Sequence, residues 1–191
     1  DILIIDDGSL EEVRIDNENP KISIIRNSIN KGKGYSLKKG FNYAYERGYT
    51  HAITLDADLQ HDPKFISKFL AIDENINIVI GARIFNHAMP FHRKFSNKIT
   101  SYLTSKLAGK KILDSQSGFR RYNLKNKSYI NCKEDGFQFE SEILINDSKF
   151  PESRVEHIDI STIYNDEKSS INNMLDTYKF VRLIVRKIFD R

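Results

Sequence analysis

The sequence predicts an α/β fold in which a mostly parallel sheet is flanked by helices. Short continuous runs of apolar and β-branched residues recur along the chain, and such runs are typical of strands buried on both faces of a parallel sheet. Segments with helical spacing of apolar residues lie between them, so strands and helices alternate. With 191 residues, 39% hydrophobic and 29% charged, the chain is expected to form one globular domain.

The first half of the chain supplies four of these strands. They are predicted at residues 2–5, 22–25, 52–55 and 76–80. Tyr35–Arg47 has apolar residues at helical spacing, and Gly48 follows as a stop signal. Pro63 suits the first turn of a second helix that runs to about Ile72, with Asp62 as its N-cap.

The second half begins with a polar loop. The expected order is a loop at 86–93, a helix at 94–107, a helical segment at 136–149, a half-exposed strand at 155–162 and a terminal helix at 173–189. We therefore divide the chain into a main domain over residues 1–172 and a basic amphipathic helix over residues 173–191.

The terminal helix has an apolar stripe and basic residues that lie largely elsewhere. The stripe consists of Met174, Leu175, Tyr178, Val181, Val185 and Ile188. One interpretation is that the stripe packs on the domain. The other is that the helix lies on an anionic membrane surface. The sequence leaves both open.

Composition limits the classes of function. No stretch approaches the roughly 20 apolar residues that a membrane helix needs. The single cysteine, Cys132, excludes an internal disulfide and a cysteine-based zinc site, and it fits a reducing, cytoplasmic compartment. The net charge of +4 indicates an anionic partner. We do not expect nucleic acid, because the basic residues are spread along the chain without interleaved stacking aromatics.

Acidic residues follow the third predicted strand. Asp56 and Asp58 are separated by one alanine, and Gln60 adds a neutral oxygen. In a loop at a strand end, these oxygens suit Mg²⁺ or Mn²⁺ and leave positions for phosphate oxygens. The alternative is a solvated acidic turn. His61, next to Asp62, is expected to be a surface or capping residue rather than a ligand.

Two further segments belong to the same predicted edge of the sheet. Asp6 and Asp7 follow the first strand, where a carboxylate can accept hydrogen bonds from a nucleobase or ribose, although a simple turn is an equal alternative. Asn30–Gly34 combines glycines with two lysines just before a helix, which suits close approach to phosphate. It lacks the spacing of a P-loop.

Taken in order, these motifs resemble those of the family-2 glycosyltransferases. They are Asp6-Asp-Gly-Ser9, Asn30-Lys-Gly-Lys-Gly34, Asp56-Ala-Asp-Leu-Gln-His-Asp-Pro63, Gly81-Ala-Arg83, Asp114-Ser-Gln-Ser-Gly-Phe-Arg120, Gly136-Phe-Gln-Phe-Glu-Ser-Glu142 and the region Ile163–Ser169. Within that family the chain is similar to the dolichyl- or polyprenyl-phosphate mannose synthase type. The resemblance implies a GT-A type, Rossmann-like nucleotide-sugar-binding fold. It also implies a preceding strand with a Pro-x-Tyr-Asn-Glu-like motif, which is not in this sequence.

The resemblance assigns roles to the donor-side residues. Asp56, Asp58 and Gln60 are expected to hold the cation against the donor diphosphate, which makes Asp58 catalytic through the metal. Asp6, Asp7, Lys33 and Asp56 are expected to bind the donor.

On the acceptor side, the resemblance places Arg83 and Arg93 near a lipid phosphate, which guanidinium groups match in shape and charge. Asp114 and Arg120 are expected to pair and shape the acceptor loop. A phosphate acceptor needs little help from a base, whereas a hydroxyl acceptor would need one, and Glu142 or Asp114 would then be the candidate.

The function expected from these features is inverting transfer of a sugar from a nucleotide donor to polyprenyl phosphate or another membrane-proximal acceptor, at the cytoplasmic face of a membrane. A nucleotidyltransferase with a similar acidic metal loop is one alternative. A noncatalytic module that binds nucleotide sugars is another.

Overall fold

The computed structural model describes residues 1–15, 19–83, 91–161 and 173–190, with the side chains of 91–93 and 173 left out. Two sheets are present among these residues. The strands β1 (Ile2–Asp6) and β2 (Ile22–Arg26) form a parallel pair. A second sheet has the order β3-β5-β4-β6, formed by β3 (His51–Thr54), β4 (Ile78–Arg83), β5 (Arg120–Asn123) and β6 (Val155–Ile160).

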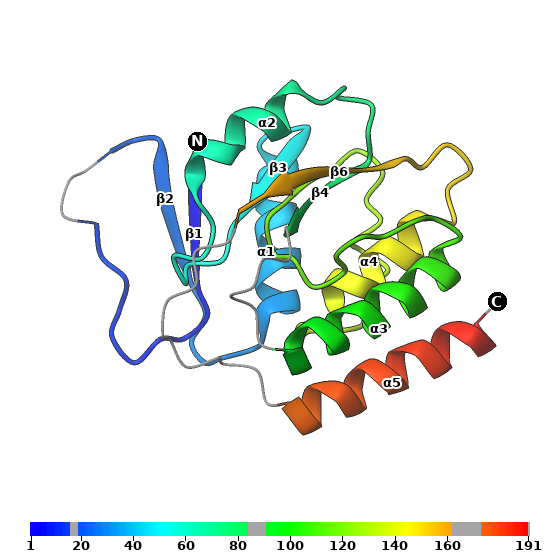
Figure 1. Ribbon diagram of the computed structural model, residues 1–191. Helices are drawn as coiled ribbons and strands as arrows, with labels where there is room; N and C mark the ends of the chain where they lie inside the picture. Colours follow the sequence, from blue (N-terminus) through cyan, green and yellow to red (C-terminus); the bar gives the residue numbers. More distant parts are fainter. Residues whose placement is uncertain (16–18, 84–90, 162–172, 191) are drawn as a thin grey trace.

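Helices lie on both faces of this second sheet (Figure 1). They are α1 (Lys33–Glu46), the short 3-10 turn η1 (Pro63–Phe65) with α2 (Ile66–Ala71), α3 (Phe91–Ala108), α4 (Phe139–Asp147) and α5 (Asn173–Phe189). Strand β4 shows how the layers are built. Ile78 and Ile80 pack into one core with Phe41 of α1 and Phe139 of α4, while Val79 packs into the other core under α2. This alternation follows from the two-residue period of a strand.

The predicted α/β class is confirmed, and the predicted strands and helices are present among the described residues. Two helix signals also behave as expected. Asp62 caps the helical turn by accepting a hydrogen bond from the backbone N–H of Lys64. Gly48 follows α1 with a φ of +81°, the left-handed conformation that glycine adopts without strain.

Strand β5 was not predicted, and it makes the sheet mixed because it runs antiparallel to both β3 and β4. Its sequence, RRYN, has no apolar alternation. The strand is buried because each arginine finds backbone oxygens. Arg121 donates to the carbonyls of Phe69, Ile72 and Asp73 at and just beyond the end of α2, where carbonyls are left without partners inside the helix.

The orientation of α5 differs from the first of the two interpretations, in which its apolar stripe packs on the domain. The stripe residues Met174, Leu175, Tyr178, Val181, Val185 and Ile188 are exposed. The buried face instead contains Leu183 and Ile184 together with the charged Lys187. Two buried carboxylates, Glu134 and Glu142, pair with basic residues of α5 and thereby turn the basic edge of the helix inward.

Candidate active site

The acidic loop begins directly after β3. Asp56, Asp58 and Gln60 are each partly exposed in it. The Asp58 carboxylate accepts a hydrogen bond from the backbone N–H of Gln60 over 3.0 Å, and Leu59 between them has a φ of 58°. The loop therefore makes a tight turn that keeps its oxygen-bearing side chains in one short segment beyond the strand end.

The Asp56 carboxylate is enclosed on one side by Gly118. A Cβ atom added at Gly118 would lie 2.7 Å from both Cγ and Oδ1 of Asp56, and closer still to Oδ2. Thr54 Oγ1 donates to the Gly118 carbonyl over 2.8 Å, which fixes the two segments against each other. Only glycine fits this position without moving the carboxylate.

The Asp56 carboxylate also forms an ion pair. Lys33, the first residue of α1, places Nζ 2.7 Å from Asp56 Oδ1 and 3.1 Å from Glu140 Oε1. Burial would lower the pKa of Lys33, but the attraction of Glu140 and Asp56 outweighs it and raises the pKa. Glu140 is buried in α4, and burial raises its pKa even though Lys33 and Arg120 act in the opposite direction. A lysine thus bridges two carboxylates at this edge.

His61 lies behind the acidic loop rather than on the surface, where it was expected. Its side chain is buried, and its ring packs against Phe119 with centroids 5.2 Å apart. Burial lowers the pKa of His61. Asp56 and Asp58 oppose this shift, whereas Lys33 and Arg83 add to it. The charged groups of the candidate site therefore lie within electrostatic reach of one buried ring.

Arg83 ends β4 and is held by Asp114. Its Nε and Nη2 donate to the two carboxylate oxygens over 2.6 and 2.9 Å, the bidentate geometry that arginine favours. Asn97 of α3 adds a third donor to Asp114 over 3.0 Å. Burial would raise the pKa of Asp114, but Arg83 and Asn97 bring it below its ordinary value. The expected pairing of Asp114 with Arg120 is wrong, because Arg83 occupies the carboxylate.

Arg120 does not reach an acceptor surface. It is fully buried, and its guanidinium donates to the backbone carbonyls of Ser117, Glu140 and Ser115 over 2.7 Å each. These contacts give it a structural role, which argues against the predicted role in acceptor binding. Arg93 falls in the first turn of α3, but its side chain lies outside the described residues, as do the region 163–169 and most of the loop at 86–93.

Glu142 is also placed differently from the prediction. Its carboxylate is fully buried and accepts from Arg186 Nη2 over 2.7 Å and Lys187 Nζ over 2.9 Å. The backbone N–H groups of Lys133 and Glu134 donate to its other oxygen. A carboxylate that is fully paired in this way anchors α5 and is not available as a general base.

Glu140 is the residue that sequence reasoning missed. It stands two positions before Glu142 in α4, so its side chain leaves the helix on the opposite side and meets Lys33. The sequence indicates only that Glu140 and Glu142 are acidic residues in the first turn of the same helix.

Asp6 and Asp7 follow β1 and are used mainly to hold the local chain. Asp6 is buried and accepts from the backbone N–H of Ser9 and from Arg26. Asp7 accepts from the backbone N–H groups of Lys31 and Gly32 over 2.9 and 2.8 Å. Asp7 thereby ties the glycine-containing loop to β1 and sets the start of α1. Its partial exposure leaves it as the stronger donor-binding candidate of the two.

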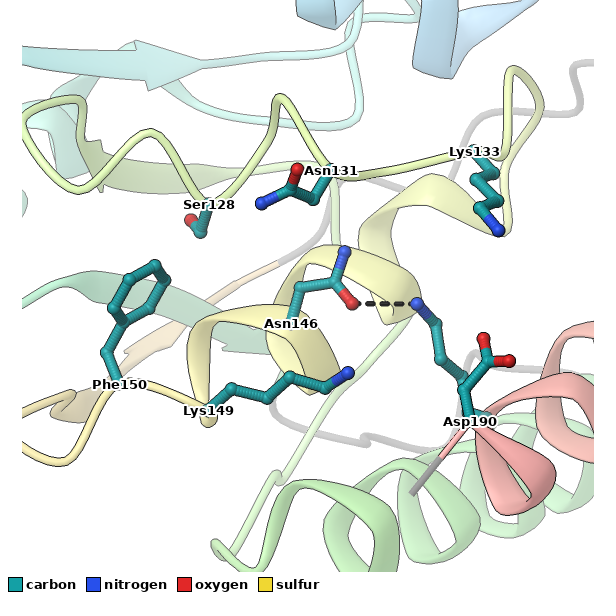
Figure 2. Close-up of a pocket in the computed structure, with 8 residues that line it drawn as sticks. Ser128, Asn131, Lys133, Asn146, Lys149, Phe150 and Asp190 are labelled. Atoms are coloured by element: carbon teal, nitrogen blue, oxygen red, sulfur yellow. Dashed lines mark hydrogen bonds between the residues drawn. The ribbon is translucent and has the colours of Figure 1, made fainter.

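A hollow of about 290 Å³ lies on another part of the surface, where α4 meets the end of α5 (Figure 2). Asn146 at its centre accepts a hydrogen bond from Lys187 over 2.7 Å, and Lys133 and Lys149 line it. Its lining contains none of the acidic-loop residues. We therefore place the candidate active site at the acidic loop and not in this hollow.

The acidic loop suits a hard divalent cation in its donor chemistry. Among residues 1–15, 19–83, 91–161 and 173–190 there is no cluster of three His, Cys, Asp or Glu side chains that could hold a metal. Two carboxylates and one amide oxygen from Asp56, Asp58 and Gln60 form a smaller set, which fits Mg²⁺ or Mn²⁺ when phosphate oxygens complete the coordination.

Comparisons with known proteins identify relatives of this chain. The chain is 28% identical over 198 residues to an uncharacterized protein of Methanocaldococcus jannaschii, with 98% of the chain and 81% of that protein covered. It is 31% identical over 186 residues to the UDP-N-acetylglucosamine–dolichyl-phosphate N-acetylglucosaminyltransferase of Methanococcus voltae, with 88% and 70% covered.

Among solved structures, the fold is similar to glucosyl-3-phosphoglycerate synthase from Mycobacterium tuberculosis in complex with Mn²⁺, UDP-glucose and phosphoglyceric acid. The TM-score is 0.71 at 13% identity, with 97% of this chain and 67% of that chain covered. In the complex of the same synthase with UDP, the match covers 61% of that chain. This likeness establishes the GT-A type fold. Because the profile of glycosyl transferase family 2 matches residues 1–136, which is more than half of the chain, this protein belongs to glycosyl transferase family 2.

Proposed function

We propose that this chain transfers a sugar from a nucleotide-sugar donor to a polyprenyl phosphate, with inversion at the anomeric carbon. The observation that carries the choice of acceptor is that both candidate bases are committed elsewhere. Glu142 is buried against α5, and Asp114 is buried against Arg83. A phosphate acceptor is already ionised at neutral pH and needs no base, whereas a hydroxyl acceptor does.

The relatives support the same acceptor class. The Methanococcus voltae enzyme is named for transfer to dolichyl phosphate. A Proteus mirabilis transferase named for undecaprenyl phosphate is 33% identical over 129 residues, although the match covers only 38% of that protein. We propose Arg83, at the end of β4, as a contact for the acceptor phosphate, with Asp114 fixing its orientation.

On the donor side, we propose that Asp56, Asp58 and Gln60 hold Mg²⁺ or Mn²⁺ and that Asp7 contributes to binding the nucleoside. A divalent cation at this loop would neutralise the charge that develops on the departing nucleoside diphosphate. The protein's own contribution is to fix the carboxylates, through the turn at Leu59 and the close contact of Asp56 with Gly118.

We also propose that the α3–α5 face contacts an anionic membrane surface. None of the described helices is long and apolar enough to cross a membrane. The exposed residues of α5 form an apolar row, and Ile99 and Tyr102 of α3 are exposed as well. Helix α3 lies beside α5 (Figure 1). Three basic residues of α5, Arg182, Arg186 and Lys187, pair with Glu134 and Glu142, whereas Lys94, Lys98 and Lys106 of α3 are exposed. An apolar row on α5 beside exposed lysines of α3 suits an anionic bilayer surface.

The acceptor is tested with matched pairs of substrates. The full chain is incubated with a panel of nucleotide sugars and Mn²⁺, and with either a polyprenyl phosphate or the polyprenol of the same length. We expect product only from the phosphate, and we expect Asp58→Asn to abolish it. Transfer to the polyprenol at a comparable rate would refute the phosphate assignment. Release of pyrophosphate when a sugar phosphate and a nucleoside triphosphate are supplied would instead favour a nucleotidyltransferase.

The membrane contact is tested by flotation with vesicles. We expect the chain to bind vesicles of phosphatidylglycerol but not of phosphatidylcholine. Val181→Asp on the outward side of α5 should weaken this binding at least about tenfold, because it places a charge in the apolar row. Asn42→Asp is the control, since it adds the same charge at an exposed position of α1, outside α3 and α5. Equal binding of both variants and wild type would refute this docking face.

A further inference from the structure

Lys33 occupies an unusual position for a residue beside a candidate metal ligand. Its ammonium lies 2.7 Å from Asp56 Oδ1, on the carboxylate that would help to hold a cation at the acidic loop, and Gly118 packs closely against the same carboxylate. An ammonium and a divalent cation that share one carboxylate repel each other. Binding of a cation at Asp56 therefore requires Lys33 to give up part of its contact.

Glu140 provides the place to which Lys33 can turn. Its Oε1 lies 3.1 Å from the same nitrogen, farther than the 2.7 Å that separates this nitrogen from Asp56 Oδ1. Apart from Lys33, this buried oxygen has no partner among the described residues. A small rotation of the lysine head toward Glu140 would shorten the longer contact, because an ammonium has three donors on a flexible stem.

The surroundings keep Glu140 in place for this exchange. Its backbone carbonyl accepts from Arg120 Nη1 over 2.7 Å, which fixes the start of α4 against β5. The Lys33 side chain is only 18% exposed, so an ammonium that left Asp56 without a second carboxylate would lose its ion pair in a poorly hydrated position. Glu140 removes that cost.

We propose that Lys33 is the internal counter-cation of Asp56 and that it transfers to Glu140 when a divalent cation binds at the acidic loop. This inference rests on the proposed metal site. It makes Glu140 a positioning residue that acts through Lys33. The exchange predicts that Lys33 and Glu140 affect metal affinity with opposite signs in the absence of donor.

The test measures Mn²⁺ binding to the full chain by the loss of the free Mn²⁺ signal in electron paramagnetic resonance, without nucleotide sugar. We expect Lys33→Met to tighten binding about tenfold or more, because a competing charge-assisted contact is removed. We expect Glu140→Gln to weaken binding by a similar factor, because Lys33 then remains on Asp56. Lys33→Gln is a second variant if Lys33→Met does not fold, as judged by circular dichroism.

The double variant separates exchange from simple loss of negative charge. If Glu140 acts through Lys33, Glu140→Gln should change the Mn²⁺ affinity little in the Lys33→Met background. If Glu140→Gln weakens Mn²⁺ binding equally in wild type and in Lys33→Met, the exchange is refuted, whereas the proposed metal site is not. If Asp58→Asn binds Mn²⁺ as well as wild type does, the proposed metal site itself is wrong, and the exchange falls with it.

Discussion

The contact between Gly118 and Asp56 gives a prediction that can be worked out from the structure. Replacing Gly118 with alanine adds one methyl group, which would lie 2.7 Å from Cγ and Oδ1 of Asp56. Ordinary contact begins at 3.4 Å, so the carboxylate must move by about 1 Å. A displacement of that size in a catalytic group can reduce the rate about 100-fold. We expect Gly118→Ala to reduce metal-dependent transfer by this factor and to weaken Mn²⁺ binding.

The effect on stability should be smaller. Overpacking by one methyl group costs roughly 1–3 kcal/mol, and Asp56 is partly exposed and can yield toward solvent. The matched control is Gly40→Ala, which is the same substitution in α1 and would press on the flexible end of the Ile5 side chain and touch Leu3 at 3.8 Å. Initial rates, Mn²⁺ affinity and melting temperature are compared for the two variants. A folded Gly118→Ala variant with unchanged turnover and Mn²⁺ affinity would refute the role of Asp56 as a metal ligand.

Three further predictions concern the buried charges and the thiol. Glu142→Gln leaves the basic partners on α5 poorly paired and should lower the free energy of unfolding by about 3 kcal/mol, which corresponds to a fall in melting temperature of roughly 6–12 °C. The control, Glu156→Gln at an exposed position, should leave the melting temperature unchanged. Equal melting temperatures of the two variants would contradict the anchoring role. Burial raises the pKa of Cys132 to about 12. A disulfide reagent at pH 8 should therefore label one thiol per chain only after unfolding. Rapid labelling of the native protein would contradict the burial of Cys132. The pKa of Asp114 in the folded protein lies below its ordinary value of 3.8. Its pairing with Arg83 therefore stabilises the fold at pH values above 3.8, and this stabilisation is lost as the pH falls through the lower, folded-state pKa. The stability difference between wild type and Asp114→Asn, measured by urea unfolding, should therefore shrink below about pH 3.8, and a difference that stays constant down to pH 2 would refute this pairing.

Local patterns were sufficient for most elements of the fold. Apolar runs predicted β1 to β4, and Asp62 with Pro63 predicted the start of the helical turn. These signals depend only on residues that are close in sequence. Strand β5 could not be found in this way. Its two arginines are buried because backbone carbonyls accept from them, and several of these carbonyls, those of Glu140 and of the end of α2, are tertiary neighbours.

The acidic loop was predicted from spacing and order, since Asp56 and Asp58 follow a recognisable strand. The sequence could not distinguish Glu140 from Glu142, which stand in the same helix two residues apart. The helix directs one toward Lys33 and the other toward α5. The chemistry of each carboxylate is therefore decided by what packs against its side of α4.

The terminal helix shows most clearly the difference between what local sequence and what tertiary packing decide. The sequence by itself determined its extent, because the helical period is a local property, and the observed bounds Asn173–Phe189 match the predicted ones. Only the tertiary structure decided which face turns inward. Burying Glu134 and Glu142 requires counter-charges, and this requirement brings Lys187 inward and leaves Val181 exposed.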